Sequence, residues 1–144
     1  MIAAFLPLLL SLPYPMPENA WTGQFRATAG QFLRAWDLHR AIAAQEDPGL
    51  LRAIWQVECT GKVVPACERS HKGACCEMQV LGGRHGNPSC EDLEASAWLC
   101  VVAADRQLER CRRMCGRSRM LGCFHSGKCE TDGSYAAAVE NKRQ

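Results

Sequence analysis

Apolar side chains recur at helical spacing in three stretches of the chain, and the first covers residues 29–45. The apolar side of that helix carries Phe32, Ala35, Trp36, Ile42 and Ala43, with Leu38 at its edge. Such a broad apolar face is typical of a helix that packs against a core. His39 falls within the same face, where a packed, hydrogen-bonded histidine is commoner than a ligand.

A second helix is predicted over residues 48–59. Asp47 stands at the N-cap position and Pro48 at the first helical position, and together they mark a helix start. The positions i, i+3, i+4 and i+7 of this helix are Leu51, Ile54, Trp55 and Glu58. A carboxylate therefore shares the apolar face of the helix with three large apolar side chains.

The third helix is predicted from the cap at Ser89, with Asp92 in the capping-box position, through residue 115. Its apolar stripe comprises Leu93, Ala97, Cys100, Val101, Ala104, Leu108, Cys111 and Cys115. Glycines and prolines make residues 60–89 rich in loops, with short strands expected around residues 77–81. A short helix over residues 134–143 ends the chain. These elements predict an α+β fold, mostly α.

The composition adds a disulfide scaffold to this picture. The chain has 144 residues, enough for one domain, and ten cysteines, an even number that suits complete pairing. Cys100 and Cys111 lie about 16 Å apart along one helix, too far for a disulfide, whose Cα atoms approach within about 7 Å. We expect such cysteines to staple the loop-rich middle, and the tail with Cys123 and Cys129, onto the long helix.

Other uses of the cysteines and charges are less favoured. The sequence contains no C-x₂-C pair, so we expect no metal and no cofactor. A disulfide between the neighbours Cys75 and Cys76 is strained, which favours two separate partners. The net charge of +2 is too small to indicate general electrostatic binding of nucleic acid. Six arginines most simply form a solvated helix face that could also attract an anionic cell wall: Arg106, Arg110, Arg112, Arg113, Arg117 and Arg119.

The first 20 residues resemble a secretory leader. Residues 2–12 are mostly apolar, too short for a membrane span of about 20 residues but suited to a signal-peptide core. No Lys or Arg precedes this run, and an amphipathic or buried N-terminal segment is the alternative. Because disulfides persist outside the cytosol, we expect residues 21–144 to form a secreted, periplasmic or cell-envelope domain.

Glu58 is the candidate catalytic residue. Burial on an apolar face disfavours the charged form of a carboxyl and raises its pKa, as a general acid requires. The structural alternative is an acid near a helix end that turns out to water or pairs with an arginine.

Four segments resemble the soluble lytic transglycosylase family of the lysozyme-like superfamily, which is related to goose-type lysozymes. "LLRAIWQVECTG" resembles the helix that ends in the family's catalytic Glu, here Glu58, with Cys59 where Ser is usual. "KGACCEMQV" resembles the Gly-Ala-x-Gly-Leu-Met-Gln-Ile/Val motif, and the matching residues are Gly73, Ala74, Met78, Gln79 and Val80. "LGCFHSGKC" resembles Ala-x-Tyr-Asn-x-Gly, and "SYAAAVE" resembles the terminal Tyr-x-x-x-Val helix. The four segments occur in the family's order from about residue 47 onward.

Two of these segments depart from the family pattern. Cys76 and Glu77 stand where the family has Gly and Leu, and Phe124 and His125 stand where it has Tyr and Asn. Phe124 has no hydroxyl with which to orient a catalytic acid.

The resemblance implies a lysozyme-like domain that cleaves peptidoglycan glycan strands at the bond from N-acetylmuramic acid to N-acetylglucosamine, forming 1,6-anhydro ends. Glu58 would be the only catalytic acid, and Met78 and Gln79 would line the sugar cleft. Glu77, Phe124 and His125 would be further substrate-facing positions. The alternatives are a muramidase that hydrolyses the same bond and a catalytically dead, cysteine-rich protein that binds glycans. No oligomeric state is indicated.

Overall fold

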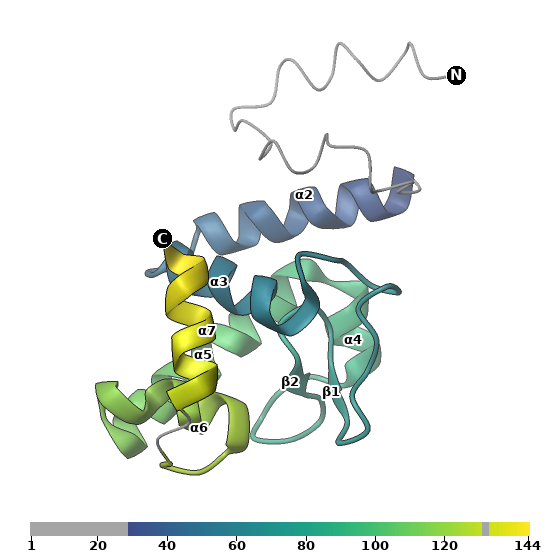
Figure 1. The fold of residues 1–144 in the computed structure, drawn as a ribbon. Coiled ribbons are helices and arrows are strands. Elements are labelled where there is room, and N and C mark those ends of the chain that lie inside the picture. The colour runs from purple at the N-terminus through teal and green to yellow at the C-terminus, as the bar shows by residue number, and fades with distance from the viewer. Residues whose placement is uncertain (1–28, 131–132) are drawn as a thin grey trace.

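Helix α2 (Ala29–Ala43) lies across one end of the molecule in a computed structural model that describes residues 29–130 and 133–144 (Figure 1). The leader proposed for residues 1–20 lies outside the described residues. The helix ends two residues before the predicted limit and buries Trp36, Leu38, Ala41 and Ile42. His39 is half-buried beside them, with its ring 5.1 Å from that of Trp55. Burial and nearby Arg52 lower its pKa, which favours the packed, neutral histidine that was expected.

Helix α3 (Pro48–Cys59) has the predicted bounds. The Asp47 side chain accepts a hydrogen bond from the Leu50 N–H at 3.0 Å, and Pro48 opens the helix. Helix α7 (Gly133–Arg143), the predicted terminal helix, packs alongside α3 (Figure 1). An ion pair of 2.7 Å between Arg143 and Asp47 joins the end of α7 to the start of α3.

A two-stranded antiparallel sheet lies in the loop-rich middle, where short strands were expected around residues 77–81. Strand β1 (Ala74–Cys75) pairs with β2 (Val80–Leu81), and Cys75 lies opposite Val80. Cys76 and Gln79, which bound the connecting turn, have φ values of 56° and 50°. This left-handed backbone is uncommon outside glycine and reverses the chain within four residues. Residues 76–79 therefore form a tight turn rather than a strand.

The predicted third helix is divided in two, which corrects the sequence expectation. Helix α4 (Cys90–Ala95) starts at Ser89, whose hydroxyl accepts from the Asp92 N–H as expected. Ser96 then takes an extended conformation, and its hydroxyl caps helix α5 (Ala97–Cys115) by accepting from the Leu99 N–H. Serine competes in this way with helical backbone bonding, so one residue ends α4 and begins α5.

Beyond α5, a short 3₁₀ helix η2 (Arg117–Arg119) leads into helix α6 (Met120–Ser126), which the apolar pattern did not predict. The six arginines expected on a solvated face are all exposed. None of the helices in residues 29–130 and 133–144 combines the length and apolar character that crossing a membrane requires.

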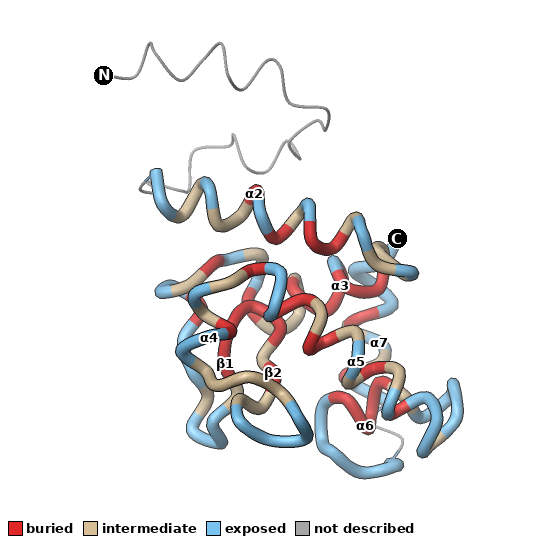
Figure 2. The backbone as a smooth tube through the Cα atoms, turned by 180° about the vertical axis from the view of Figure 1, so that it is seen from behind, coloured by how far each residue is buried: buried red, intermediate tan, exposed pale blue. Residues whose placement is uncertain are grey.

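Five disulfides pair all ten cysteines. They join Cys59 to Cys67, Cys75 to Cys90, Cys76 to Cys100, Cys111 to Cys123, and Cys115 to Cys129. Cys75 and Cys76 have separate partners, and three bridges staple the β-turn and the tail to α5, as expected. Buried segments of α2, α3, α5 and the hairpin face inward together (Figure 2). The fold is thus α+β, mostly α, and disulfide-stapled.

Candidate active site

The candidate site is a hydrogen-bonded pair formed by Glu58 and Tyr135. Glu58 is the last residue but one of α3, and Tyr135 lies in the first turn of α7. The packing of α7 along α3 brings the two side chains together, and the Tyr135 hydroxyl donates to Glu58 Oε1 at 2.6 Å. Tyr135 is only 6% exposed, so its neighbours in α7 and α3 fix its ring. The pair therefore holds the carboxyl in one orientation.

The surroundings of Glu58 raise the pKa of its carboxyl. Burial is the largest cause, because it removes water from the charged form. The Tyr135 hydrogen bond and the charge of nearby His125 act in the opposite direction without cancelling the effect of burial. Glu58 thus holds its proton to a higher pH than an ordinary glutamate. The structural alternatives were a side chain that turns out to water or pairs with an arginine; Glu58 is partly buried and pairs with no arginine of residues 29–130 and 133–144.

His125 completes the cluster from a third element. It lies near the end of α6, is exposed, and stacks on Tyr135 with ring centroids 4.4 Å apart and planes 4° from parallel. Positive charge on the His125 imidazole stabilises the Glu58 carboxylate through space. The cluster therefore contains an acid, a hydroxyl that orients it, and an imidazole on its solvent side.

Two interactions fix the chain immediately after Glu58. Cys59, the next residue, is bonded to Cys67, and the loop between them is anchored by the Trp55 indole N–H, which donates to the Lys62 carbonyl at 2.7 Å. Thr60 closes α3 with a left-handed φ of 51°. Cys59, which stands where the family that this segment resembles has serine, thus serves as a covalent anchor next to the acid.

Two residues predicted to contact substrate lie in the core. Met78 is fully buried, and Phe124 is 5% exposed with its carbonyl accepting from the Gln107 side chain. A fully buried side chain presents no surface to a ligand, so Met78 fills the core and does not line a sugar cleft. The backbone of Phe124, rather than its ring, makes the polar contact.

Gln79 is half-buried, and its amide ties two loops together. The side-chain N–H₂ group donates to the carbonyls of Glu68 and Cys76, at 3.0 and 3.1 Å. These bonds hold the β1–β2 turn against the loop that follows Glu58. Contact between Gln79 and a sugar remains a prediction, whereas its place in this network is observed.

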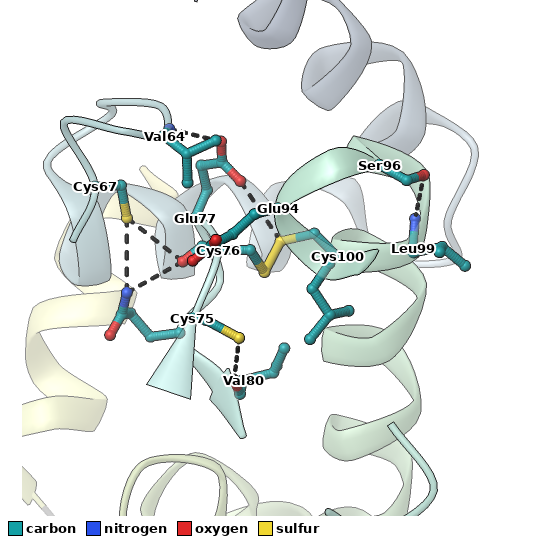
Figure 3. Close-up of a disulfide and its surroundings, with 12 residues drawn as sticks. Val64, Cys67, Cys75, Cys76, Glu77, Val80, Glu94, Ser96, Leu99 and Cys100 are labelled. Atoms are coloured by element: carbon teal, nitrogen blue, oxygen red, sulfur yellow. Dashed lines mark hydrogen bonds between the residues drawn. A yellow bond between two sulfur atoms is a disulfide. The ribbon is translucent and has the colours of Figure 1, made fainter. Parts of the chain in front are cut away.

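Glu77, which stands where the family motif has Leu, is fully buried and paired with Arg34 of α2. The guanidinium makes two bonds to the carboxylate, at 2.9 and 2.7 Å, and also donates to the Leu93 carbonyl. The Val64 N–H donates to the same carboxylate at 3.0 Å (Figure 3). This placement corrects the expectation that Glu77 faces substrate. It docks α2 onto the hairpin instead.

The residues around Glu77 also resemble a metal site in composition alone. Cys76, Glu77 and Cys100 bring their ligand atoms close together. Cys76 and Cys100 are joined in a disulfide, however (Figure 3), and Glu77 is bonded to Arg34. A metal needs thiolates and a free carboxylate, so the chemistry of this group in the observed state is structural.

Tyr135 lies in the segment that resembles the family's terminal helix, but no role was predicted for it from the sequence. The available signal was the spacing of Tyr135 and Val139, both buried, which turns one face of α7 toward the rest of the fold. Comparison of the chain with family models, with curated proteins and with solved structures yields no match. The geometry of the Glu58–Tyr135 pair and the resemblance of its segments are thus the two indications of what the site does.

Proposed function

We propose that the protein is a lysozyme-like lytic transglycosylase that cleaves peptidoglycan glycan strands with Glu58 as its only catalytic acid. The observation that carries the proposal is the partly buried Glu58, whose pKa is raised while Tyr135 holds its carboxyl. A proton donor that remains protonated near neutral pH is what glycosidic bond cleavage requires. The family-like segments around Glu58 and Tyr135 support the choice of substrate.

In the proposed reaction the Glu58 carboxyl protonates the oxygen between N-acetylmuramic acid and N-acetylglucosamine. The bond from that oxygen to C1 of the muramyl ring breaks, and positive charge develops over C1 and the ring oxygen. The Glu58 carboxylate then removes the proton from the C6 hydroxyl of the same ring as O6 bonds to C1. The 1,6-anhydro ring closes, and Glu58 regains its proton without any water being consumed.

The charges around Glu58 favour this single-acid route over hydrolysis. Hydrolytic glycosidases commonly use a second carboxylate as base or nucleophile. The described groups that shift the pKa of Glu58 are Tyr135 and His125, and neither is a carboxylate. Glu77 is neutralised by Arg34, and Glu68 is exposed in a loop, so neither is assigned a catalytic role. A muramidase remains the alternative enzyme.

Tyr135 supports an active protein rather than a dead binding module. Phe124 lacks the hydroxyl expected at its position, but Glu58 accepts a hydrogen bond from Tyr135. That bond strengthens when Glu58 is ionised, so it stabilises the carboxylate that forms as the proton leaves. The five disulfides fit a protein of an oxidising compartment, and we propose a secreted or cell-envelope location.

Mass spectrometry of digested peptidoglycan tests the reaction. The proposal expects fragments with 1,6-anhydromuramic ends, which are lighter by one water than reducing ends. Reducing ends would establish the muramidase alternative. Binding of peptidoglycan without any released fragment would establish the catalytically dead alternative.

A further inference from the structure

A groove of about 660 Å³ lies between α2 and the junction of α4 with α5. The elements that line it differ from α3, α6 and α7, which supply Glu58, His125 and Tyr135. In Figures 1 and 2, α2 spans the molecule above α4 and the start of α5. The residues that matter for its chemistry are Leu33, Asp37 and Arg40 on one wall and Glu94 and Trp98 on the other. Its volume falls in the range of small-ligand sites.

Both walls expose large apolar side chains. Leu33 of α2 is 58% exposed, and Trp98 in the first turn of α5 is 53% exposed. The other tryptophans of the described chain, Trp36 and Trp55, are buried in the core. An indole left half in water beside a groove offers a flat apolar surface with a polar N–H at its edge. Trp98 is thus available as a platform for a ligand.

The charged side chains of the groove fall into two groups. Arg34 is bonded to Glu77, and Glu94 is bonded to Arg69 at 2.7 Å, so these residues hold the walls in place. The side chains of Asp37 and Arg40 are exposed and make no hydrogen bond or ion pair among residues 29–130 and 133–144. Their acceptor and donor capacities remain available next to the apolar walls.

We propose that this groove is a second glycan-binding site, which anchors a long peptidoglycan strand away from Glu58. The ligand class rests on the proposed function. The apolar C–H face of a pyranose ring would stack on Trp98. Its hydroxyls would donate to Asp37 and accept from Arg40.

The two unpaired charges favour a sugar over an apolar helix of another protein. A helix that covered Leu33 and Trp98 with apolar side chains would also remove water from Asp37 and Arg40. Charges that lose water without gaining partners oppose binding. A hydroxyl-rich chain supplies both a donor and an acceptor at each ring, so it satisfies the two residues while the indole is covered.

The test is a pelleting assay with purified insoluble peptidoglycan, using Glu58→Gln as the background so that the polymer is not consumed. Trp98→Ala should weaken binding about tenfold, as expected for the loss of an aromatic platform. Arg40→Gln, a change at an exposed side chain, should weaken binding less. Met114→Ala is the matched control, because Met114 is 55% exposed on the same helix but does not line the groove.

A turnover assay separates this inference from the proposed function. In the otherwise wild-type protein, Trp98→Ala should slow digestion of long strands and leave digestion of short soluble fragments unchanged. Equal pelleting of the Trp98→Ala and Met114→Ala proteins, or no pelleting by either, would overturn the second site. Failure of the wild-type protein to release fragments would instead overturn the proposed function, while loss of pelleting on Trp98→Ala would still support the site.

Discussion

The hydroxyl of Tyr135 donates a 2.6 Å hydrogen bond to Oε1 of Glu58 from 77 residues further along the chain. The bond stabilises the ionised carboxylate and therefore lowers the pKa of Glu58, against the larger effect of burial. Tyr135→Phe removes this bond while retaining the ring that stacks on His125. The change therefore tests the contribution of the hydroxyl separately from that of the ring.

We predict that Tyr135→Phe lowers the rate of glycan cleavage about 10- to 100-fold, the loss expected for a hydrogen bond to a charged group. With the bond removed, the pKa of Glu58 rises further. Because Glu58 must be protonated to act, the alkaline limb of the pH–rate profile should move to higher pH. Rates of fragment release measured across pH check both effects. An unchanged profile would exclude Tyr135 as the residue that orients the acid.

Glu58→Gln should stabilise the fold at neutral pH. A carboxyl whose pKa is raised by folding binds its proton more tightly in the folded chain, so its contribution is complete below its ordinary pKa near 4.5. That contribution is lost as the pH rises through the raised pKa. Since Gln does not titrate, the variant should gain stability on the wild type over this range.

Thermal unfolding at pH 4 and pH 7 checks this prediction. The variant should gain stability on the wild type at pH 7 and show a smaller gain or none at pH 4. A gain of the same size at both pH values would show that proton binding by Glu58 is not its cause. A loss at pH 7 would contradict the raised pKa.

The Arg34–Glu77 pair predicts a strongly non-additive pair of substitutions. Glu77→Leu introduces the residue type of the motif that this segment resembles, but it leaves the Arg34 guanidinium, whose side chain is 10% exposed, without its partner. We expect a loss of about 3 kcal/mol or more in the free energy of unfolding, because a buried charge is left without its partner. The Val64 N–H loses its acceptor as well.

Adding Arg34→Met to Glu77→Leu should recover most of that stability, since an apolar pair can replace a buried ion pair at little cost. Urea unfolding of the single and double variants completes the thermodynamic cycle. Additive losses in the double variant would mean that the two residues act independently.

The disulfide framework makes a direct covalent prediction. Mass spectrometry of unreduced proteolytic peptides should recover the five observed pairs, and a thiol assay in denaturant should find no free thiol. Replacing Cys76 and Cys100 with alanine opens a loop closed at a separation of 24 residues, which should cost about 3 kcal/mol. Any peptide that joins Cys75 to Cys76 would contradict the framework.

Helix geometry explains why the stapling of α5 could be predicted from sequence. Cys100 and Cys111 share a helix face but are too distant to pair, so any partner had to lie on another element, and the partners are Cys76 and Cys123. The helix starts at Asp47 and Ser89 could also be predicted, because each capping side chain bonds to a backbone N–H only three residues away.

The features that could not be predicted from the sequence depend on side chains that compete with the backbone for hydrogen bonds, or on tertiary packing. Ser96 lies inside an apolar stripe, yet its hydroxyl captures the Leu99 N–H and divides the helix. Helix α6 is seven residues long and has no side-chain cap, so it gave no periodic signal. The partners of Glu58 and Glu77 lie 77 and 43 residues away, on helices whose docking no local pattern specifies.

The most direct test of the central claim is digestion of purified peptidoglycan by the wild-type protein and by Glu58→Gln, at equal concentration and with folding confirmed by circular dichroism. Gln keeps the shape of the side chain and removes the proton that the reaction needs. We predict that the wild type releases anhydro fragments and that the variant releases them at least about 100-fold more slowly. Equal rates from the two proteins would contradict the role of Glu58 as the catalytic acid.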